Sequence, residues 1–492
     1  MRTFLIICII IIFFLCRLNP AYAKDFTGET IYFIVIDRFA DGDPGNNPTG
    51  KIFSQDKSEW KLYWGGDLEG IIDRLPYIKS LGATAIWITP VIENTEDLYI
   101  YGDEKIAAYH GYWGKDFKRI NPYFGTMETF DKLVKYAHNM GIKIILDIVL
   151  NHTSPTGQGC DGAIYDNGVL KATYSKDPEG WFHHKGITDF TILSESEWED
   201  KNLFDLADLN QENSDVDKYL KDFALMWADR GIDAFRIDTV RHVPCKYIKS
   251  FASEIYAKKD IFIFGEWSFG NFRNKEDREF AEKGIIKFSW ESDISVIDFN
   301  LQKAITDVLA ENKSFTLITE ALKLDEKVKD PSSWITCVDN HDMPRFISTA
   351  IANGATEGEG KKKFEMAIYL IMTSRGIPCI YYGSEQFIHN DTPSAWGVGG
   401  EPYNRQMMNN FSTTGKFFKK INKLAVLRQE NPAIGRGSQK TLFVNDDIYV
   451  YERELEGNFV LVAMNKGKSG EVNISTLLPD GDYKLSKEKQ KK

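Results

Sequence analysis

The sequence predicts an α/β protein built on a (β/α)8 or TIM barrel, with an insertion after the third strand and an all-β C-terminal domain. Three observations lead to this prediction. Eight apolar, β-rich runs alternate with helical patterns between residues 31 and 382. Carboxylates follow several of these runs directly. After residue 431 the pattern changes to short strands alone.

The expected barrel strands are short apolar runs at 31–37, 83–89, 142–150, 232–237, 261–264, 295–299, 334–338 and 377–382. Helices are expected over 70–80, 126–140, 216–230, 246–258 and 362–373. Thr126 is the expected N-cap of the second of these helices, and Gly141 is expected to end it. An open doubly wound sheet would match the same order of elements. Acidic residues at the ends of several different strands favour the barrel.

The remaining segments set the expected domain boundaries. The barrel takes residues 24–150 and 212–431. Residues 151–211 are rich in glycine, aspartate and aromatic residues and too long for a simple loop, so we expect a small inserted domain. Residues 432–492 are expected to form an all-β domain with a basic, disordered end.

Residues 1–23 have the pattern of a secretory signal peptide. Arg2 precedes an apolar stretch at 4–15, and Ala21-Tyr22-Ala23 is a small-x-small cleavage site. A retained N-terminal anchor is the alternative. No later segment is apolar enough to span a membrane. We therefore expect a secreted monomer, extracellular or periplasmic, without a membrane span in its mature form.

The composition disfavours some partners. Residues 1–23 contain two of the 60 basic residues and none of the 71 acidic ones, so the mature net charge is 58 − 71 = −13. An acidic surface argues against nucleic-acid binding and suits a neutral substrate or bound cations. The later cysteines are far apart, and we expect buried free thiols at Cys337 and Cys379 rather than a disulfide.

Three carboxylates are candidates for glycoside cleavage. Asp238 and Glu266 end apolar runs, and Asp342 follows another by four residues. The reaction needs an acid that protonates the leaving oxygen and a carboxylate that meets the oxocarbenium-like carbon. Each residue alone is more often a cap or an ion-pair partner. Three of them in this order indicate a catalytic site.

The surroundings of these carboxylates predict their roles. Arg236 shares a strand face with Asp238, so we expect it to lower the pKa of that carboxyl, which suits a nucleophile. Glu266 lies between an apolar strand and Trp267, where desolvation raises a pKa and suits an acid/base. Asp342 is expected to hydrogen-bond to sugar hydroxyls.

Four segments together resemble the signature regions of the α-amylase family of glycoside hydrolases, family 13. They are residues 147–152 (DIVLNH), 231–242 (GIDAFRIDTVRH), 265–267 (GEW) and 338–342 (VDNHD). The resemblance implies a (β/α)8 barrel with an insertion after the third strand and a β-sandwich behind it. It also implies a nucleophile at Asp238, an acid/base at Glu266 and a transition-state stabiliser at Asp342.

The resemblance implies a set of substrate-binding residues as well. Arg236, His152 and His341 match helpers around the bond that is cleaved. Tyr112 matches a sugar-stacking tyrosine, and Arg405 resembles an outer-subsite arginine, although Glu401 stands where the family has aspartate. The other members of the set are His110, Trp113, Phe190, Phe204, Arg241 and His242.

Calcium is the expected cofactor, because hard cations take several oxygen ligands. Oxygen-bearing residues crowd one loop rich in glycine and proline: Asp41, Asp43, Asn46 and Asn47. From spacing alone this loop is either a plain turn or a cation site. A resemblance to a glucanotransferase calcium site adds Gly65 and Asp67. A second site is implied at Asn151, Asp208 and the backbone carbonyl of His242.

The sequence also bears on whether the covalent intermediate passes to water or to another sugar. Phe204 and Phe190 match aromatic residues of glucanotransferases, which favours transfer. Ser268 replaces a phenylalanine of those enzymes, and their extra starch-binding domains do not follow the first, shortened β-domain. We therefore expect an α-amylase that hydrolyses internal α-1,4 bonds of starch and maltooligosaccharides. The alternative is a cyclodextrin glucanotransferase or maltogenic amylase type of transglycosylase.

More distant alternatives fit less well. Non-catalytic relatives that accompany membrane transporters lose the carboxylates and carry a membrane span. A protein that only binds starch would not need Arg236 beside Asp238. The insertion and the first-strand motif argue against α-1,6-specific or sucrose-type enzymes.

Overall fold

The structure is a computed structural model that describes residues 24–268, 273–468 and 472–476. The signal peptide predicted at 1–23 lies outside these residues. At the centre is a parallel sheet in the order β14-β13-β12-β7-β2-β1-β16-β15. Its strands are β1 (Ile31–Ile34), β2 (Ala85–Ile88), β7 (Lys143–Ile148), β12 (Ala234–Ile237), β13 (Phe262–Gly265), β14 (Ser295–Val296), β15 (Ile335–Cys337) and β16 (Ile377–Tyr381). A parallel bridge between Ile297 and Ile335 joins the two ends of this order, so the sheet forms the predicted barrel.

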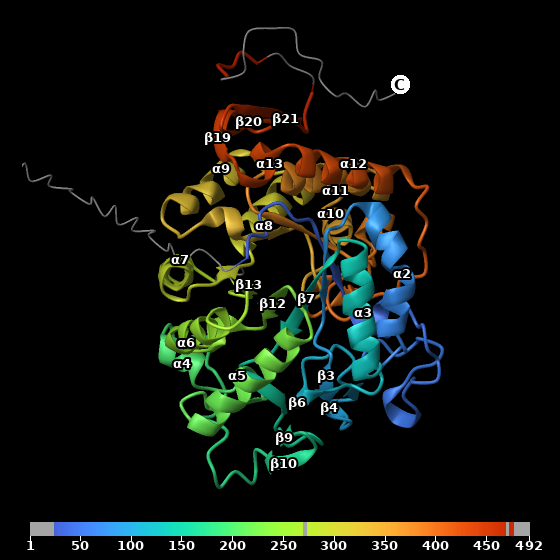
Figure 1. Ribbon diagram of the computed structural model, residues 1–492. Coiled ribbons are helices and arrows are strands. Elements are labelled where there is room, and N and C mark those ends of the chain that lie inside the picture. The colour runs from blue at the N-terminus through green and yellow to red at the C-terminus, as the bar shows by residue number, and fades with distance from the viewer. Residues whose placement is uncertain (1–23, 269–272, 469–471, 477–492) are drawn as a thin grey trace, which may run out of the picture.

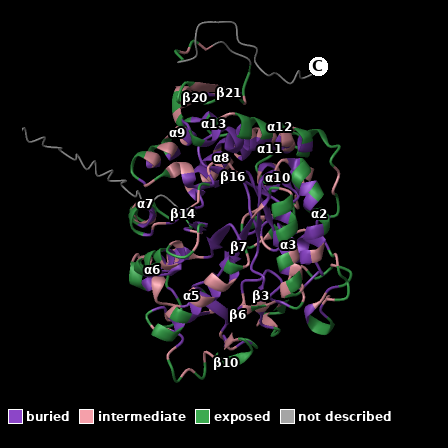
Figure 2. Ribbon diagram, viewed as in Figure 1, coloured by how far each residue is buried: buried purple, intermediate pink, exposed green. Residues whose placement is uncertain are grey.

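Helices surround the barrel strands. The main ones are α2 (Leu68–Leu81), α3 (Met127–Asn139), α5 (Ser214–Asp229), α6 (Cys245–Tyr256), α7 (Lys275–Glu291), α8 (Phe299–Ile305), α9 (Thr316–Leu322), α10 (Phe346–Ala352), α11 (Glu357–Thr373) and α12 (Lys416–Glu430). Figure 1 shows α2 and α3 on one side of the strands and α5, α6 and α7 on the other. Figure 2 shows buried residues on the strands and on the inner faces of these helices.

The helix α3 illustrates how the sequence sets an element. The side chain of Thr126 accepts the amide hydrogen of Thr129, so Thr126 is the predicted N-cap. Phe130, Leu133, Val134 and Ala137 are buried, and this spacing places them on one helical face against the barrel. Beyond the helix, Gly141 has φ +66°, a conformation that ends a helix readily because glycine has no Cβ.

The first strand is shorter than predicted. β1 ends at Ile34, and the short helix α1 (Ile36–Phe39) takes the rest of the segment expected at 31–37. The reason is a long-range contact, because the Asp37 carboxylate accepts the amide hydrogens of Trp64 and Gly65 at 3.0 and 3.1 Å. These bonds fix a turn that the local apolar pattern cannot reveal.

The segment expected to form the insertion contains β8 (His152–Pro155), β9 (Ile164–Asp166), β10 (Val169–Ala172), α4 (Glu195–Glu199) and β11 (Leu206–Asp208). β9 and β10 join β6 (Gly114–Ile120) and β3 (Ile92–Asn94) in one four-stranded sheet. Next to these strands is a hairpin of β4 (Tyr99–Tyr101) and β5 (Glu104–Ile106). The insertion therefore shares a sheet with a segment that the sequence assigned to the barrel.

The C-terminal part begins with α13 (Pro432–Arg436), and a three-stranded antiparallel sheet follows. Its strands are β19 (Ser438–Val444), β20 (Ile448–Leu455) and β21 (Asn458–Asn465), and they lie at one end of the molecule in Figure 1. The expected all-β pattern is thus present. A second sheet, which a sandwich requires, stays a prediction.

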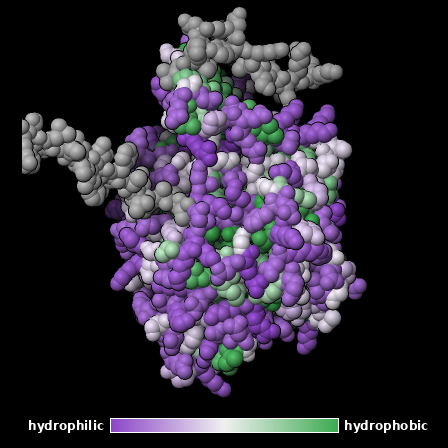
Figure 3. Space-filling view, viewed as in Figure 1, coloured by the Kyte–Doolittle hydropathy of each residue, from purple (hydrophilic) through white to green (hydrophobic). Residues whose placement is uncertain are grey.

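Two further expectations concern surfaces and thiols. Among the described helices, none has the length and apolarity that crossing a membrane requires. Figure 3 shows a mostly hydrophilic face with a group of hydrophobic residues near its centre.

Cys337 and Cys379 are buried and free, as predicted.

Candidate active site

The three predicted carboxylates meet at the C-terminal rim of the barrel, and Arg236 joins two of them. Asp238 directly follows β12 and Glu266 directly follows β13, while Asp342 lies on the loop after β15. Nη1 of Arg236 donates to Oδ1 of Asp238 at 2.8 Å, and Nη2 donates to Oε2 of Glu266 at 2.7 Å. The guanidinium is buried, so both bonds lie in a region of low dielectric constant.

A fourth carboxylate, which the sequence analysis did not select, lies beneath this pair. Asp147 in β7 is fully buried and accepts hydrogen bonds from Nη1 of Arg236 at 2.9 and 3.0 Å. It also accepts from the Tyr112 hydroxyl at 2.8 Å and the Trp87 indole at 3.0 Å. An acidic residue inside an apolar strand was the available signal for it. Its position orients Arg236 and Tyr112 toward the rim.

Burial has the largest effect on the pKa values of Asp238 and Glu266, the two carboxylates that accept hydrogen bonds from Arg236. It raises the pKa of Asp238, and the opposing pull of Arg236 is too weak to offset it. The expectation of a lowered pKa for Asp238 was therefore wrong in direction. Burial raises the pKa of Glu266 further, as predicted. Burial therefore favours one proton on this pair near neutral pH, as a site with one acid and one ionised carboxylate requires.

Two predicted histidines lie beside the carboxylates. Nε2 of His152 is 4.0 Å from Oδ2 of Asp238, and Nε2 of His341 is 3.4 Å from Oδ2 of Asp342. Burial lowers the pKa of His152 to about 3 and that of His341 well below its ordinary value. Both rings are therefore neutral and can donate a hydrogen bond without adding charge. The Tyr112 ring stacks on His341 with centroids 5.3 Å apart.

One side of the site is aromatic. Phe204 is 54% exposed, has φ +57°, and its ring centroid lies 5.6 Å from that of Phe190. Phe190 in turn lies 6.1 Å from the ring of His242. A strained backbone and an exposed ring are both unfavourable in isolation, which is typical of a position kept for function.

Arg241 lines the cleft, and its side chain is also held by two aromatic rings. Its guanidinium carbon lies 4.0 Å from the Trp198 ring and 4.4 Å from the Trp267 ring, and Nη1 donates to the carbonyl of Ser268 at 2.7 Å. The side chain thus supports the wall of the cleft around Ser268. Behind it lies a smaller cavity of about 270 Å³, which none of the three carboxylates lines.

The opposite side is charged. Arg405 contacts Oδ1 of Asp342 at 3.2 Å and Oε1 of Glu401 at 2.9 Å. It also donates to the carbonyl of His341 at 2.8 Å and to the Tyr109 hydroxyl at 3.1 Å. Glu401 therefore makes an ion pair with Arg405 in the position where the family resemblance implied aspartate.

A single cleft of about 450 Å³ connects these features. The predicted residues that line it are His110, Tyr112, Trp113, His152, Phe190, Phe204, Asp238, Arg241, His242, Glu266, His341, Asp342, Glu401 and Arg405. Arg236 lies below the lining. Leu203, Leu206, Thr239 and Trp396 also line the cleft and were not singled out from the sequence.

The first predicted calcium loop contains unpaired buried oxygens. Oδ1 of Asn46 and Oδ1 of Asn47 are buried without a hydrogen-bond partner. A Cβ on Gly65 would lie 2.3 Å from Oδ1 of Asn47, so only glycine permits this approach. Asp67 accepts amide hydrogens from Gly42, Asp43 and Gly70 at 3.1, 2.8 and 2.7 Å and caps α2. Asp41 accepts from Nδ2 of Asn47 at 2.9 Å. The unpaired amide oxygens fit a hard cation.

The second predicted site brings three oxygens together. The side-chain oxygen of Asn151 faces the His242 carbonyl oxygen at 2.6 Å and Oδ1 of Asp208 at 3.3 Å. If the Asn151 amide were rotated by 180°, its nitrogen would donate to both of these oxygens. With the amide as it stands, a cation would hold the three oxygens together. The donor set therefore fits calcium.

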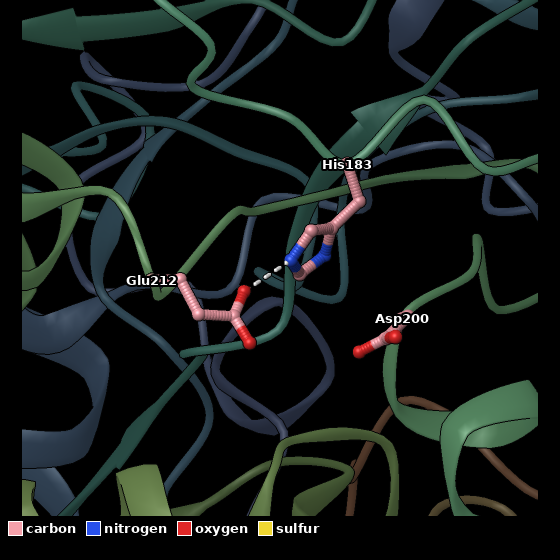
Figure 4. A group of neighbouring side chains, drawn as sticks. All are labelled: His183, Asp200 and Glu212. Atoms are coloured by element: carbon pink, nitrogen blue, oxygen red, sulfur yellow. Dashed lines mark hydrogen bonds and ion pairs between the residues drawn. The ribbon is translucent and has the colours of Figure 1, made fainter.

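A further group near Asp208 was not expected from the sequence. His183, Asp200 and Glu212 point toward one another with ligand atoms within 4.8 Å (Figure 4). Both ring nitrogens of His183 are occupied, with Asp208 at 2.5 Å and Glu212 at 2.8 Å. The histidine thus anchors Asp208 from behind.

The chain is also similar in sequence to known proteins. The sequence model of the α-amylase catalytic domain matches residues 33–423. A cyclomaltodextrin glucanotransferase of Niallia circulans is 40% identical over 473 residues, which cover 94% of this chain and 62% of that protein. An α-amylase of the same organism is 39% identical, covering 94% of this chain and 85% of that protein.

Among solved structures, a cyclomaltodextrin glucanotransferase with a three-domain ABC distribution matches with a TM-score of 0.86 and 43% identity. The match covers 92% of this chain and 90% of that one. The chain thus spans about 62% of the length of the first curated glucanotransferase and nearly all of the three-domain one.

Proposed function

This chain belongs to the α-amylase family of glycoside hydrolases, and we propose that it is a retaining enzyme of the cyclodextrin glucanotransferase type. It cleaves internal α-1,4 bonds of starch and passes the glycosyl group to a sugar hydroxyl. When that hydroxyl belongs to the same glucan chain, the product is cyclic. Asp238 and Glu266, held side by side on Arg236, supply the nucleophile and the acid/base that this mechanism needs, and the aromatic side of the cleft supports transfer.

The first step uses the proton on Glu266. Glu266 gives this proton to the glycosidic oxygen as the bond to C1 breaks, and the ionised Asp238 carboxylate bonds to C1. The leaving glucan departs with the proton. Asp342 and the neutral rings of His152 and His341 accept and donate hydrogen bonds to the hydroxyls of the sugar that remains.

The second step reverses these movements. Glu266, now ionised, takes the proton of the acceptor hydroxyl as that oxygen attacks C1, and the ester bond to Asp238 breaks. The acceptor arrives on the side of the cleft where the leaving group left, which is the Glu266 side. The Phe190–Phe204 pair, which contacts His242, supplies an apolar surface in the same cleft.

The Phe190–Phe204 pair is the observation that favours transfer to a sugar over hydrolysis. Exposed aromatic rings bind the C–H faces of a sugar and leave water without hydrogen-bond partners. One argument for hydrolysis was the expectation that glucanotransferases carry extra starch-binding domains, but a three-domain glucanotransferase 43% identical to this chain removes that argument.

Hydrolysis remains the second candidate, and one residue favours it. Ser268 is exposed on the cleft wall, and a hydroxyl group there can hold a water molecule near the intermediate. The 39% identity to an α-amylase is in keeping with this candidate.

Product analysis on soluble starch tests the choice. The wild-type enzyme should form cyclic glucans, which resist exo-acting glucosidases, and added glucose should divert the products to linear ones. Phe204→Ser should lower the ratio of cyclic to linear products severalfold, while the exposed ring of Tyr136, which lies outside the cleft, provides the control variant Tyr136→Ser. Linear products alone from the wild type, with no coupling to glucose, would assign hydrolysis instead.

We propose calcium at both oxygen clusters. One ion would be held by the loop at 41–47 with Gly65 and Asp67, and the other by Asn151, Asp208 and the His242 carbonyl. Calcium would supply positive charge that holds these oxygens together, and so fix the insertion against the strand that carries Asp238. Export after cleavage near Ala23 is proposed from the sequence pattern of residues 1–23.

A further inference from the structure

Trp396 is an exposed aromatic residue in the cleft that neither the sequence motifs nor the mechanism uses. It lies between the short strands β17 (Pro393–Ser394) and β18 (Gly397–Val398), on the loop that follows β16. Its side chain is 58% exposed, and it lines the same cleft as the three carboxylates. A large ring exposed inside a cleft offers an apolar face to a ligand bound there.

The hairpin that carries Trp396 is built to hold it. Oγ of Ser394 accepts the amide hydrogen of Trp396 at 3.1 Å and donates to the carbonyl of Gly397 at 2.9 Å. Gly399 has φ +68°, and a Cβ on it would lie 2.0 Å from the carbonyl oxygen of Asn390. This close approach requires glycine, so the backbone of the hairpin follows one compact path at the edge of the cleft.

The position of the hairpin assigns Trp396 to one end of the cleft. A Cβ on Gly397 would lie 3.4 Å from Cγ of Pro344, which is two residues beyond Asp342. The same loop continues to Glu401 and Arg405, and Arg405 contacts Asp342. Trp396 thus lies on the Asp342 side, where the glycosyl group stays after cleavage. Ser268, two residues beyond Glu266, belongs to the Glu266 side, where the acceptor enters.

We propose that Trp396 forms an additional glucan-binding subsite on the donor side of the cleft, beyond the Glu401–Arg405 ion pair. The indole face packs on the C–H face of a glucose residue remote from the bond that is cleaved. The subsite therefore binds α-1,4-glucans long enough to reach it and gives no help to short ones. This inference rests on the proposed function, because it takes an α-glucan as the ligand.

The test uses binding to a variant that cannot turn over. Asp238→Asn enzyme is titrated calorimetrically with maltotriose and with maltoheptaose, alone and combined with Trp396→Ala, Trp396→Phe or Trp290→Ala. Trp290 is 59% exposed on α7 and does not line the cleft, so it is the matched control. Thermal melting verifies that each variant is folded.

Trp396→Ala should weaken maltoheptaose binding about fivefold, as expected for uncovering ~40 Å² of apolar ring surface, and leave maltotriose binding unchanged. Trp396→Phe should restore part of the loss, and Trp290→Ala should have no effect. Equal affinities for maltoheptaose with and without Trp396 would overturn the subsite, and so would equal losses for both sugars. If the Asp238→Asn enzyme binds neither sugar, the glucan-active assignment fails, and the subsite fails with it.

Discussion

Replacement of Asp147 by asparagine tests how the buried charges set the pH dependence of the reaction. Asp147 and Asp238 accept hydrogen bonds from the same nitrogen of Arg236, at 2.9 and 2.8 Å, so their oxygens lie at most about 5.7 Å apart. The charge of Asp147 is among the causes that raise the pKa of Asp238. The substitution Asp147→Asn would keep the shape of the side chain and remove that charge.

The size of the effect follows from the distance. Two unit charges about 5.7 Å apart repel by ~3 kcal/mol at an effective dielectric constant of ~20, which corresponds to ~2 pKa units. Asp147 itself has a pKa raised to about 6 by burial, so it carries its full charge only above that pH, and ~2 units is the upper limit of its effect on the acid limb. Without it, the pKa of Asp238 falls. Asp238 must be ionised to attack C1, so the acid limb of kcat/KM should move to lower pH by about 1–2 units.

The assay is kcat/KM for a maltooligosaccharide between acid and neutral pH. The quantity to compare is the pH at the midpoint of the acid limb. The maximal kcat/KM is not compared, because the substitution also removes a buried partner of Arg236. Asp339→Asn is the control, since this buried carboxylate bonds to the Phe346 amide at 3.1 Å and the Ser384 hydroxyl at 3.3 Å instead. An acid limb that stays in place or moves to higher pH in folded Asp147→Asn enzyme would refute the reasoning.

Two other predictions follow from the site. Asp238→Asn and Glu266→Gln should each lower the rate of glucan cleavage about 10³-fold or more with an unchanged melting temperature, and near-normal rates in either would remove its assigned role. Chelation of calcium should lower the melting temperature, since saturation at ~100 times Kd stabilises a fold by about 2.7 kcal/mol. Asp208→Asn should reduce that shift, and a wild-type melting curve indifferent to chelator would count against both calcium sites.

The sequence predicted the barrel well because its strands are apolar runs that bury completely, and such runs are visible without tertiary information. The end of β1 was placed too late, since the turn at Asp37 depends on amides of Trp64 and Gly65. The shared sheet of β3, β6, β9 and β10 was missed for a related reason. Pairing between strands far apart in the chain leaves no local pattern.

The candidate site shows the same difference between features set by local sequence and features set by long-range contacts. Residues within short motifs were located from the sequence, and the structure brings them to one cleft. The net effect on Asp238 was misjudged because Arg236 is adjacent in sequence, whereas burial is a property of the whole fold. Arg241 lines the cleft, but its place between Trp198 and Trp267 depends on two other segments and could not be predicted from its motif.

The single guanidinium of Arg236 between Asp238 and Glu266 has a consequence for the energy of the reaction. In the proposed first step Asp238 loses its negative charge by forming an ester, while Glu266 gains one by giving up its proton. The total charge around Arg236 is therefore conserved, and only its location shifts from one arm of the guanidinium to the other. Such an exchange requires little reorientation of the surrounding dipoles, so the barrel can remain rigid while the covalent intermediate forms and breaks.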